Sequence, residues 1–130
     1  PVDLVCEPRH ASWFQPEADQ LMRDNEVARV AADPAKSPEA QTPGGHPRIA
    51  YFRWHGSPRM YYSDYDEPWL AEQARRLKEL PKGVQPWCIF DNTASGAALK
   101  NALQLRYHLQ PLPRTASTAS GTTARMPALP

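Results

Sequence analysis

Two cationic residues stand two positions apart in the stretch YFRWHG, residues 51–56, whose aromatic residues are otherwise typical of a strand. Side chains alternate between the two faces of a strand, so Arg53 and His55 share one face while Phe52 and Trp54 share the other. The apolar face suits packing under helices. Arg53 and His55 are therefore expected to point into the interior of a barrel, near its top.

A buried charge is costly unless it is paired and hydrogen-bonded, and replacing such a pair by apolar residues is often neutral or stabilising. Glu7 ends another apolar stretch and can pair with a cation at this place. Two interpretations stay open: an internal ion-pair network that closes the mouth of a barrel, or a ligand-binding or catalytic site. The second is favoured because the charged residues follow strands at the end where parallel α/β folds place function.

General acid–base chemistry is one use of these residues. His10 and His55 are candidates, each oriented by a carboxylate, because imidazole titrates near neutral pH. The catalytic set that we predict is Glu7, His10, His55 and Asp91. With Asp33 it also includes the ligand types of a Zn²⁺ or Mn²⁺ site, although no H-x-x-x-H or H-E-x-x-H spacing defines one. A divalent metal is thus one open alternative for a cofactor that the sequence does not identify.

Arginines near the same strand ends favour an anionic substrate, because guanidinium binds phosphate or carboxylate through two parallel hydrogen bonds. Backbone N–H groups at the start of the last helix, around residues 93–95, can add donors for an anion. Tyr61 and Tyr62 can stack on a sugar or base, or can cover apolar surface. The predicted substrate-binding residues are Arg9, Arg53, Asn92, Tyr61 and Tyr62, with Arg59 as a further cation.

The elements that position these residues follow from the hydrophobic pattern. Short apolar stretches that end in polar residues predict strands at 2–9, 27–33, 48–56 and 86–92. Helices are predicted over 12–25 with Pro16 in the first turn, over 64–82 with Asp66 as N-cap, and over 93–109 with Asn92 or Thr93 as cap. Strands that alternate with helices indicate a parallel sheet with helices outside it, whose carboxyl ends form one rim.

The remaining segments lack such a pattern. Residues 34–48 are rich in Pro, Gly and polar residues and predict a loop. The tail, residues 111–130, has no acidic residue and no periodicity, and is expected to be disordered. Trp13 and Trp69 are expected in the core, and Cys6 and Cys88 as buried thiols.

The overall composition excludes few functions. The 130 residues carry a formal net charge of +1, which gives no clear nucleic-acid or acidic-lipid signal. No apolar run approaches the roughly 18–20 residues of a membrane span, so we expect a cytoplasmic protein without a membrane partner. The sequence begins at Pro1, as a processed or partial chain does.

The motifs EPRHASWF, AD, YFRWHG, YYSDY and IFDNTASGAALKNALQL resemble, in this order, the YecE-like family, also called domain of unknown function 72. The resemblance covers about residues 3–109. It implies the C-terminal half of a TIM-type (β/α)8 barrel, with four parallel strands and their helices in a partial domain at residues 1–110 and the tail at 111–130. Asp91 departs from the pattern, which commonly has Asn at this position.

The family has no firmly established activity, so the resemblance implies a fold and motif positions without a reaction. Carried over to this chain, the motif positions are Glu7, Arg9, His10, Trp13, Asp33, Arg53, His55, Gly56, Asp91 and Asn92. One hypothesis is a hydrolase-like enzyme that acts on an anionic or phosphorylated small molecule. The alternative is a non-catalytic half barrel that binds or assembles, through self-association or with an N-terminal half.

Overall fold

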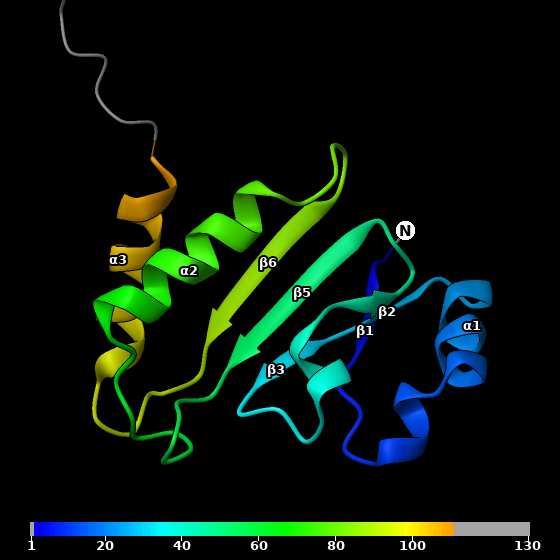
Figure 1. Ribbon diagram of the computed structural model, residues 1–130, viewed down its shortest axis with the longest axis horizontal. Helices are drawn as coiled ribbons and strands as arrows, with labels where there is room; N and C mark the ends of the chain where they lie inside the picture. Colours follow the sequence, from blue (N-terminus) through cyan, green and yellow to red (C-terminus); the bar gives the residue numbers. More distant parts are fainter. Residues whose placement is uncertain (1, 111–130) are drawn as a thin grey trace, which may run out of the picture.

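The computed structural model describes residues 2–110, which form an α/β fold with helices packed on a largely parallel set of strands (Figure 1). The predicted tail, residues 111–130, lies outside the described residues. The strands are β1 (Leu4–Cys6), β2 (Val27–Arg29), β3 (Ala31–Asp33), β4 (Gly44–Gly45), β5 (Ile49–Trp54) and β6 (Gln85–Phe90). They form two three-stranded sheets, in the orders β1-β2-β4 and β3-β5-β6.

Three of the pairings are parallel, as the alternation of strands and helices predicts. β1 pairs with β2, β3 with β5, and β5 with β6, while β4 pairs with β2 in the antiparallel direction. The predicted strand at 27–33 is divided at Val30, so its first part belongs to one sheet and its last part to the other. The backbone N–H of Val30 donates to the carbonyl of Cys6 at 2.9 Å, which continues the pairing with the first strand across the division.

The first two α-helices start close to their predicted first turns, whereas the third starts later than predicted. α1 (Pro16–Asp24) has Pro16 at its start, where the missing N–H costs nothing. α2 (Glu67–Lys78) begins after Asp66, whose carboxylate accepts from the N–H of Trp69 at 3.0 Å. α3 (Ala97–Leu109) begins after Gly96, which has a φ of +78°. The predicted cap at Asn92 or Thr93 is wrong, because residues 93–96 turn before the helix begins.

Residues 34–48, predicted to be a loop, also contain a short 3-10 helix, η2 (Pro38–Gln41), and strand β4. A partly buried ion pair and a hydrogen bond, both made by Asp19, fix this segment to the rest of the fold. The Asp19 carboxylate of α1 accepts from the N–H of Gly45 at 2.7 Å and lies 3.5 Å from Nε of Arg29. Arg29 in turn donates to the carbonyl of Glu39 at 3.0 Å, so α1, β2, β4 and η2 share one polar junction.

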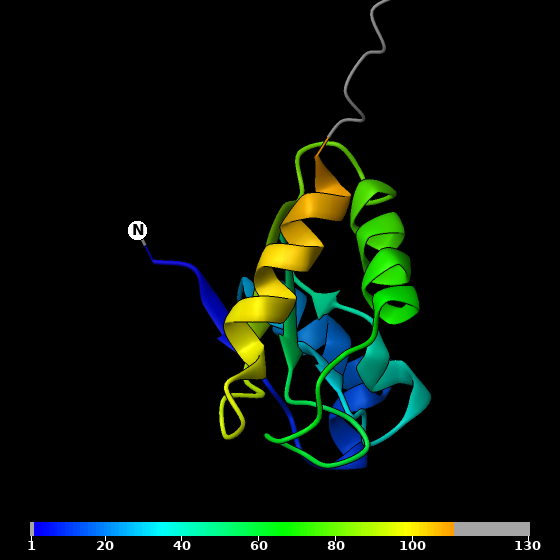
Figure 2. The same cartoon turned by 90° about the vertical axis from the view of Figure 1, so that its left-hand side faces the viewer.

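The core lies between the strands and α2, on the face predicted from alternation. Phe52 and Trp54 are buried there against α2, with Leu70 completely buried and Leu105 of α3 beside them. Figure 2 shows α2 and α3 side by side, with β1 and the N-terminus on the side away from α2. Arg53 therefore lies on the opposite face of β5, which points away from α2. No helix in the described part of the chain is long and apolar enough to cross a membrane.

Candidate functional site

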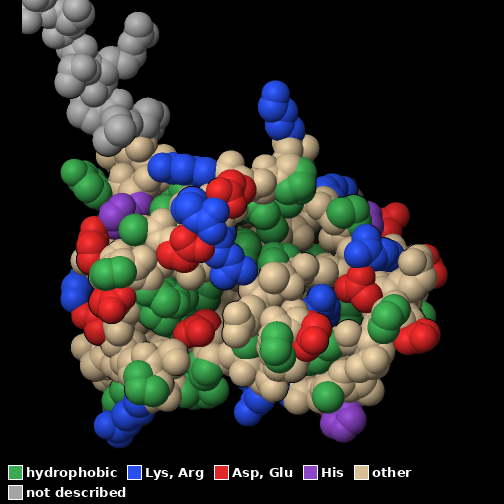
Figure 3. Space-filling model, viewed as in Figure 1, with side chains coloured by type: hydrophobic (Ala, Val, Ile, Leu, Met, Phe, Trp, Pro, Cys, Tyr) green, Lys and Arg blue, Asp and Glu red, His purple; other side chains and the backbone are tan. Residues whose placement is uncertain are grey.

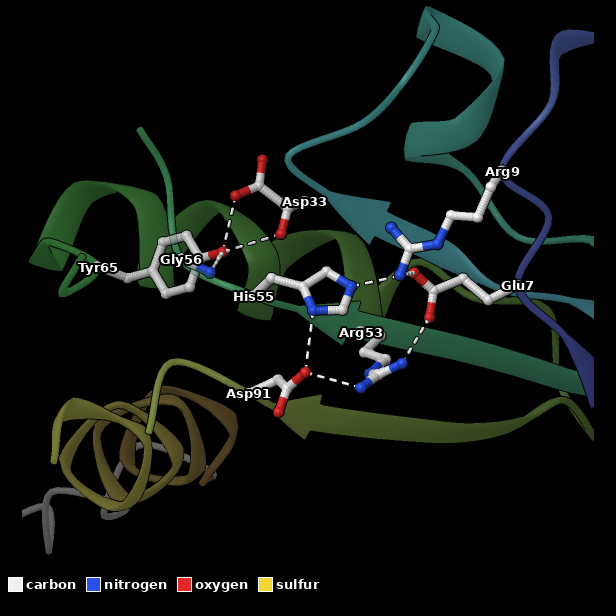
Figure 4. Close-up of polar contacts among 8 residues, drawn as sticks. All are labelled: Glu7, Arg9, Asp33, Arg53, His55, Gly56, Tyr65 and Asp91. Carbon is white, nitrogen blue, oxygen red and sulfur yellow. Dashed lines mark hydrogen bonds and ion pairs between the residues drawn. The ribbon is translucent and has the colours of Figure 1, made fainter. Parts of the chain in front are cut away.

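His55 lies between two carboxylates at the carboxyl ends of the strands (Figure 4). Its Nε2 is 2.9 Å from Oε1 of Glu7, and its Nδ1 is 2.9 Å from Oδ2 of Asp91. These partners follow β1 and β6, the strands at the two ends of the pairing order, while His55 follows β5. An ionised carboxylate only accepts hydrogen bonds, so a ring with a proton on each nitrogen satisfies both contacts.

Two arginines complete the cluster. Arg53 donates from Nη1 to Glu7 at 2.9 Å and from Nη2 to Asp91 at 2.7 Å, which joins the same two carboxylates a second time. Arg9 forms an ion pair with Glu7, with 2.9 Å between Nη2 and Oε1. Five of the predicted site residues, Glu7, Arg9, Arg53, His55 and Asp91, thus form one connected cluster, and their functional roles stay a prediction.

Exposure rises from the centre of the cluster outward. The side chain of His55 is completely buried, those of Glu7 and Asp91 are 13% and 25% exposed, and those of Arg53 and Arg9 are 38% and 48% exposed. The guanidinium groups are therefore the parts of the cluster that solvent reaches most. Each guanidinium has five N–H groups, and the contacts with the carboxylates of the cluster use only part of them.

The electrostatic surroundings favour the ionised form of Glu7. Burial acts against the charge, but hydrogen bonds from His55 and Arg53 and the charge of Arg9 outweigh it and hold the pKa of Glu7 below its usual range. The hydrogen bond to Glu7 raises the pKa of Arg53 further above its already high value, against the smaller opposing effect of burial. Glu7 and Arg53 are thus both charged at neutral pH.

Tyr61 covers His55 from the loop that follows β5. Its ring meets the imidazole edge to face at a centroid distance of 5.7 Å, and its N–H donates to the carbonyl of His55 at 2.5 Å. Tyr61 has a φ of +68°, a left-handed conformation that costs free energy for a residue with a β-carbon. The carbonyl of Tyr61 accepts from the N–H of Ala94 at 3.0 Å, so the loop after β6 stabilises this conformation.

A second polar group lies behind the cluster around Tyr65, for which the sequence pattern predicted no role. The hydroxyl of Tyr65 donates to the carboxylate of Asp33 at 2.7 Å and accepts from the N–H of Gly56 at 2.8 Å. Burial, followed by Asp33, strongly raises the pKa of Tyr65, so the phenol keeps its proton. Gly56 has a φ of +93°, and a β-carbon there would lie 2.9 Å from the carbonyl of Ser63.

Asn92 belongs to a buried network rather than to the surface. Its Nδ2 donates to the carbonyl of Ser63 at 2.9 Å and to Oδ1 of Asn101 at 2.8 Å, and both asparagines are completely buried. Asn101 also donates to Asp64 and to the carbonyl of Tyr65. The signal for this network was one asparagine within the apolar stripe of the last predicted helix.

The other predicted site residues lie apart from the cluster or are engaged locally. His10 caps the 3-10 helix η1 (Ala11–Phe14), where its Nδ1 accepts from the N–H of Ser12 at 3.3 Å. Tyr62 is exposed, with the guanidinium of Arg59 over its ring at 3.9 Å. Trp13 is 40% exposed, so its predicted place in the core is wrong, whereas Trp69 packs against the core as predicted.

Two predicted ligand-binding features differ from the structure. The backbone of residues 93–95 does not begin α3, and the N–H of Ala94 already donates to Tyr61. Within residues 2–110, no group of three or more His, Cys, Asp or Glu side chains is arranged to hold a metal ion. Both nitrogens of His55 face carboxylates, and Asp33 contacts Tyr65 instead.

These features define an α/β domain with a charged cluster at the carboxyl ends of parallel strands. The chain belongs to the DUF72 family, described as a protein of unknown function, whose family model matches residues 1–125. No curated protein matches the chain significantly.

Solved structures of the family share this fold. A DUF72 family protein from Thermotoga maritima has 29% sequence identity and a TM-score of 0.68 over 84% of this chain and 46% of that protein. A second, from Enterococcus faecalis, has 28% identity and a TM-score of 0.63 over 81% of this chain and 47% of that protein. The chain thus spans slightly less than half the length of either protein.

Proposed function

We propose that the chain binds a small anionic molecule, most simply one that carries a phosphate group, through Arg9 and Arg53. The observation that carries the proposal is the arrangement of these guanidinium groups. Glu7 and Asp91 fix Arg53 through two hydrogen bonds, while its side chain stays 38% exposed. A donor that is already held in place loses little freedom when a ligand binds.

The distribution of charges supports an anion at this rim. The two arginines balance the charges of Glu7 and Asp91, and the side chains of the arginines are the more exposed of these groups. A cavity of about 210 Å³ on the helix side of the same strand ends is lined by Asp33, Asp64 and Asp66 among others, and these carboxylates disfavour an anion there. The ligand is therefore assigned to the open face of the strands.

We assign His55 a positioning role, because its completely buried side chain touches Glu7 and Asp91 rather than solvent. Hydrolysis at this site is a further proposal, since it requires a ligand to reach the imidazole or a carboxylate.

We also propose that the described strands are the C-terminal half of a (β/α)8 barrel. Parallel pairing of β1, β2, β3, β5 and β6 and the coverage of 46% and 47% support that architecture.

Isothermal titration calorimetry with inorganic phosphate tests the binding proposal. Arg53→Met and Arg9→Met are each expected to weaken binding by about tenfold or more, the equivalent of one lost charge-assisted contact. Arg48→Met is the matched control, because Arg48 precedes β5 at its opposite end and pairs with Asp3. Equal affinity in all four proteins, or no phosphate binding by the unsubstituted chain, would contradict the proposal.

A further inference from the structure

A stripe of apolar residues on α3 is exposed within the described structure. Leu99, Leu103 and Tyr107 follow one another at intervals of four residues, and they are 70%, 48% and 73% exposed. This spacing places them on one face of the helix. A single exposed apolar residue is ordinary, but a helical stripe of three large ones is typical of a face that packs against another element.

The outer surface of α2 is charged rather than apolar, so an exposed apolar stripe is not common to all helices of this fold. Arg75 forms ion pairs with Glu72 and Glu79 on the outer surface of α2. Figure 3 shows basic and acidic side chains side by side over this helix. α2 therefore has the surface of a solvated outer helix, whereas α3 does not.

Apolar residues are also exposed at the opposite end of the fold. Leu21 of α1 is 55% exposed, Trp13 of η1 is 40% exposed, and Leu4 of β1 is 56% exposed. In Figure 1, α3 and α1 lie at the two extremes of the molecule, with the strands between them. The two exposed apolar surfaces thus flank β6 at one end and β1 at the other.

Apart from β4, the strands follow one another in the order β1, β2 with its continuation β3, β5 and β6. β1 and β6, the first and last in this order, each have one edge without a strand partner among residues 2–110. Open edges carry backbone N–H and C=O groups that are ready to pair with another strand. Both strands run in the same direction as β5, because all pairings along this order are parallel. A strand that adds to either edge in the parallel direction would continue the sheet.

We infer that a second copy of the chain closes the sheet, with β6 of each copy beside β1 of the other around a two-fold axis. This symmetry pairs β6 and β1 of the two copies in the parallel direction, covers the open edges of these two strands and brings the α3 stripe of one copy against Leu21 and Trp13 of its partner. The length of the chain supports a second copy as the partner that closes the sheet. One chain covers 46% and 47% of two solved family members, so two copies contain about as much chain as one such domain.

The arrangement has a consequence for the site. Arg53 and Tyr51 share the face of β5 that points away from α2, and Trp87 of β6, the register partner of Tyr51, is 48% exposed. A second copy turns this open face into an interior and places two copies of the cluster at one mouth. The inference rests on the exposed surfaces and strand edges, and it stands whether or not phosphate binds.

Sedimentation equilibrium of the full chain tests the inference, with an expected mass of twice 14.6 kDa. Leu103→Glu on α3 and Leu21→Lys on α1 each place a charge in both interfaces, and each variant is expected to be monomeric. A mixture of the two variants should restore a dimer, because one interface then pairs Glu with Lys and the other keeps both leucines. Ala71→Glu, at an exposed position of α2, is the control and should remain dimeric.

The mixture separates this arrangement from other dimers. If α3 packed against α3, Leu21→Lys would remain dimeric and mixing would restore nothing. If further DUF72 sequence in a longer polypeptide is the true occupant, the 130-residue chain sediments at 14.6 kDa at all concentrations. Either result overturns the inference. Circular dichroism spectra that match the unsubstituted chain confirm that the variants fold.

Discussion

Replacement of Glu7 by Gln is expected to destabilise the fold by about 2 kcal/mol at pH 7. Glu7 accepts from His55 and Arg53 and pairs with Arg9, each at 2.9 Å. The contact with the buried imidazole is worth about 2 kcal/mol, as for other hydrogen bonds to charged groups. The two contacts with partly exposed arginines add less than about 1 kcal/mol each, and the amide oxygen of Gln retains about half of the total.

The loss depends on pH in a direction that the structure fixes. The pKa of Glu7 in the folded chain lies below its ordinary value of 4.5. The folded state therefore binds fewer protons than the unfolded state near this pH, and the stabilisation is lost as pH falls through the lowered folded pKa. The free-energy difference between the chain and Glu7→Gln is thus expected to be constant from about pH 8 to pH 5 and to shrink below this range.

Urea unfolding followed by tryptophan fluorescence measures both effects, at one protein concentration because assembly also affects stability. Asp3→Asn is the control, since Asp3 is an exposed carboxylate that pairs only with Arg48 among the described residues. The control is expected within about 0.5 kcal/mol of the unsubstituted chain. A Glu7→Gln variant that matches this control, or a difference that grows below pH 5, would refute the account of the cluster.

Two further predictions concern buried groups. Tyr65→Phe removes the hydroxyl that joins Asp33 to the N–H of Gly56, and is expected to cost about 1–3 kcal/mol of unfolding free energy in the same urea assay; a change below 0.5 kcal/mol would show that the hydroxyl is dispensable. Burial raises the pKa of the Cys88 thiol to about 12. Cys88, which is partly buried, should therefore react with Ellman's reagent at pH 8 more slowly in the folded chain than in urea, and equal rates in the two states would contradict this prediction.

Local pattern was enough to predict the segments that form β1, β2, β3, β5 and β6 and the positions of two helices, but not β4. Alternation along β5 correctly separates Phe52 and Trp54, which pack on α2, from Arg53, which does not. Pro16 and Asp66 mark the starts of α1 and α2 because a missing N–H and a capping carboxylate act within one turn. These interactions lie close in sequence, so the sequence reveals them.

The features that were missed depend on distant contacts. The turn before α3 is held by the bond from Ala94 to Tyr61, more than thirty residues earlier, so the residues after Asn92 did not reveal it. Trp13 of η1 is likewise 40% exposed, which its hydrophobicity alone did not indicate. Among the site residues, alternation and strand order predicted the meeting of the charged residues, but not the local engagement of His10.

NMR titration of the arginine side chains with inorganic phosphate tests the central claim most directly. The Nε–H resonances of Arg9 and Arg53, assigned from their Met variants, are expected to shift and to saturate together, while that of Arg48 stays in place. Saturation at the two cluster arginines would locate an anion at the carboxyl ends of the strands. Shifts that are absent, or that are equal and unsaturated at all arginines, would contradict an anion-binding site at the cluster.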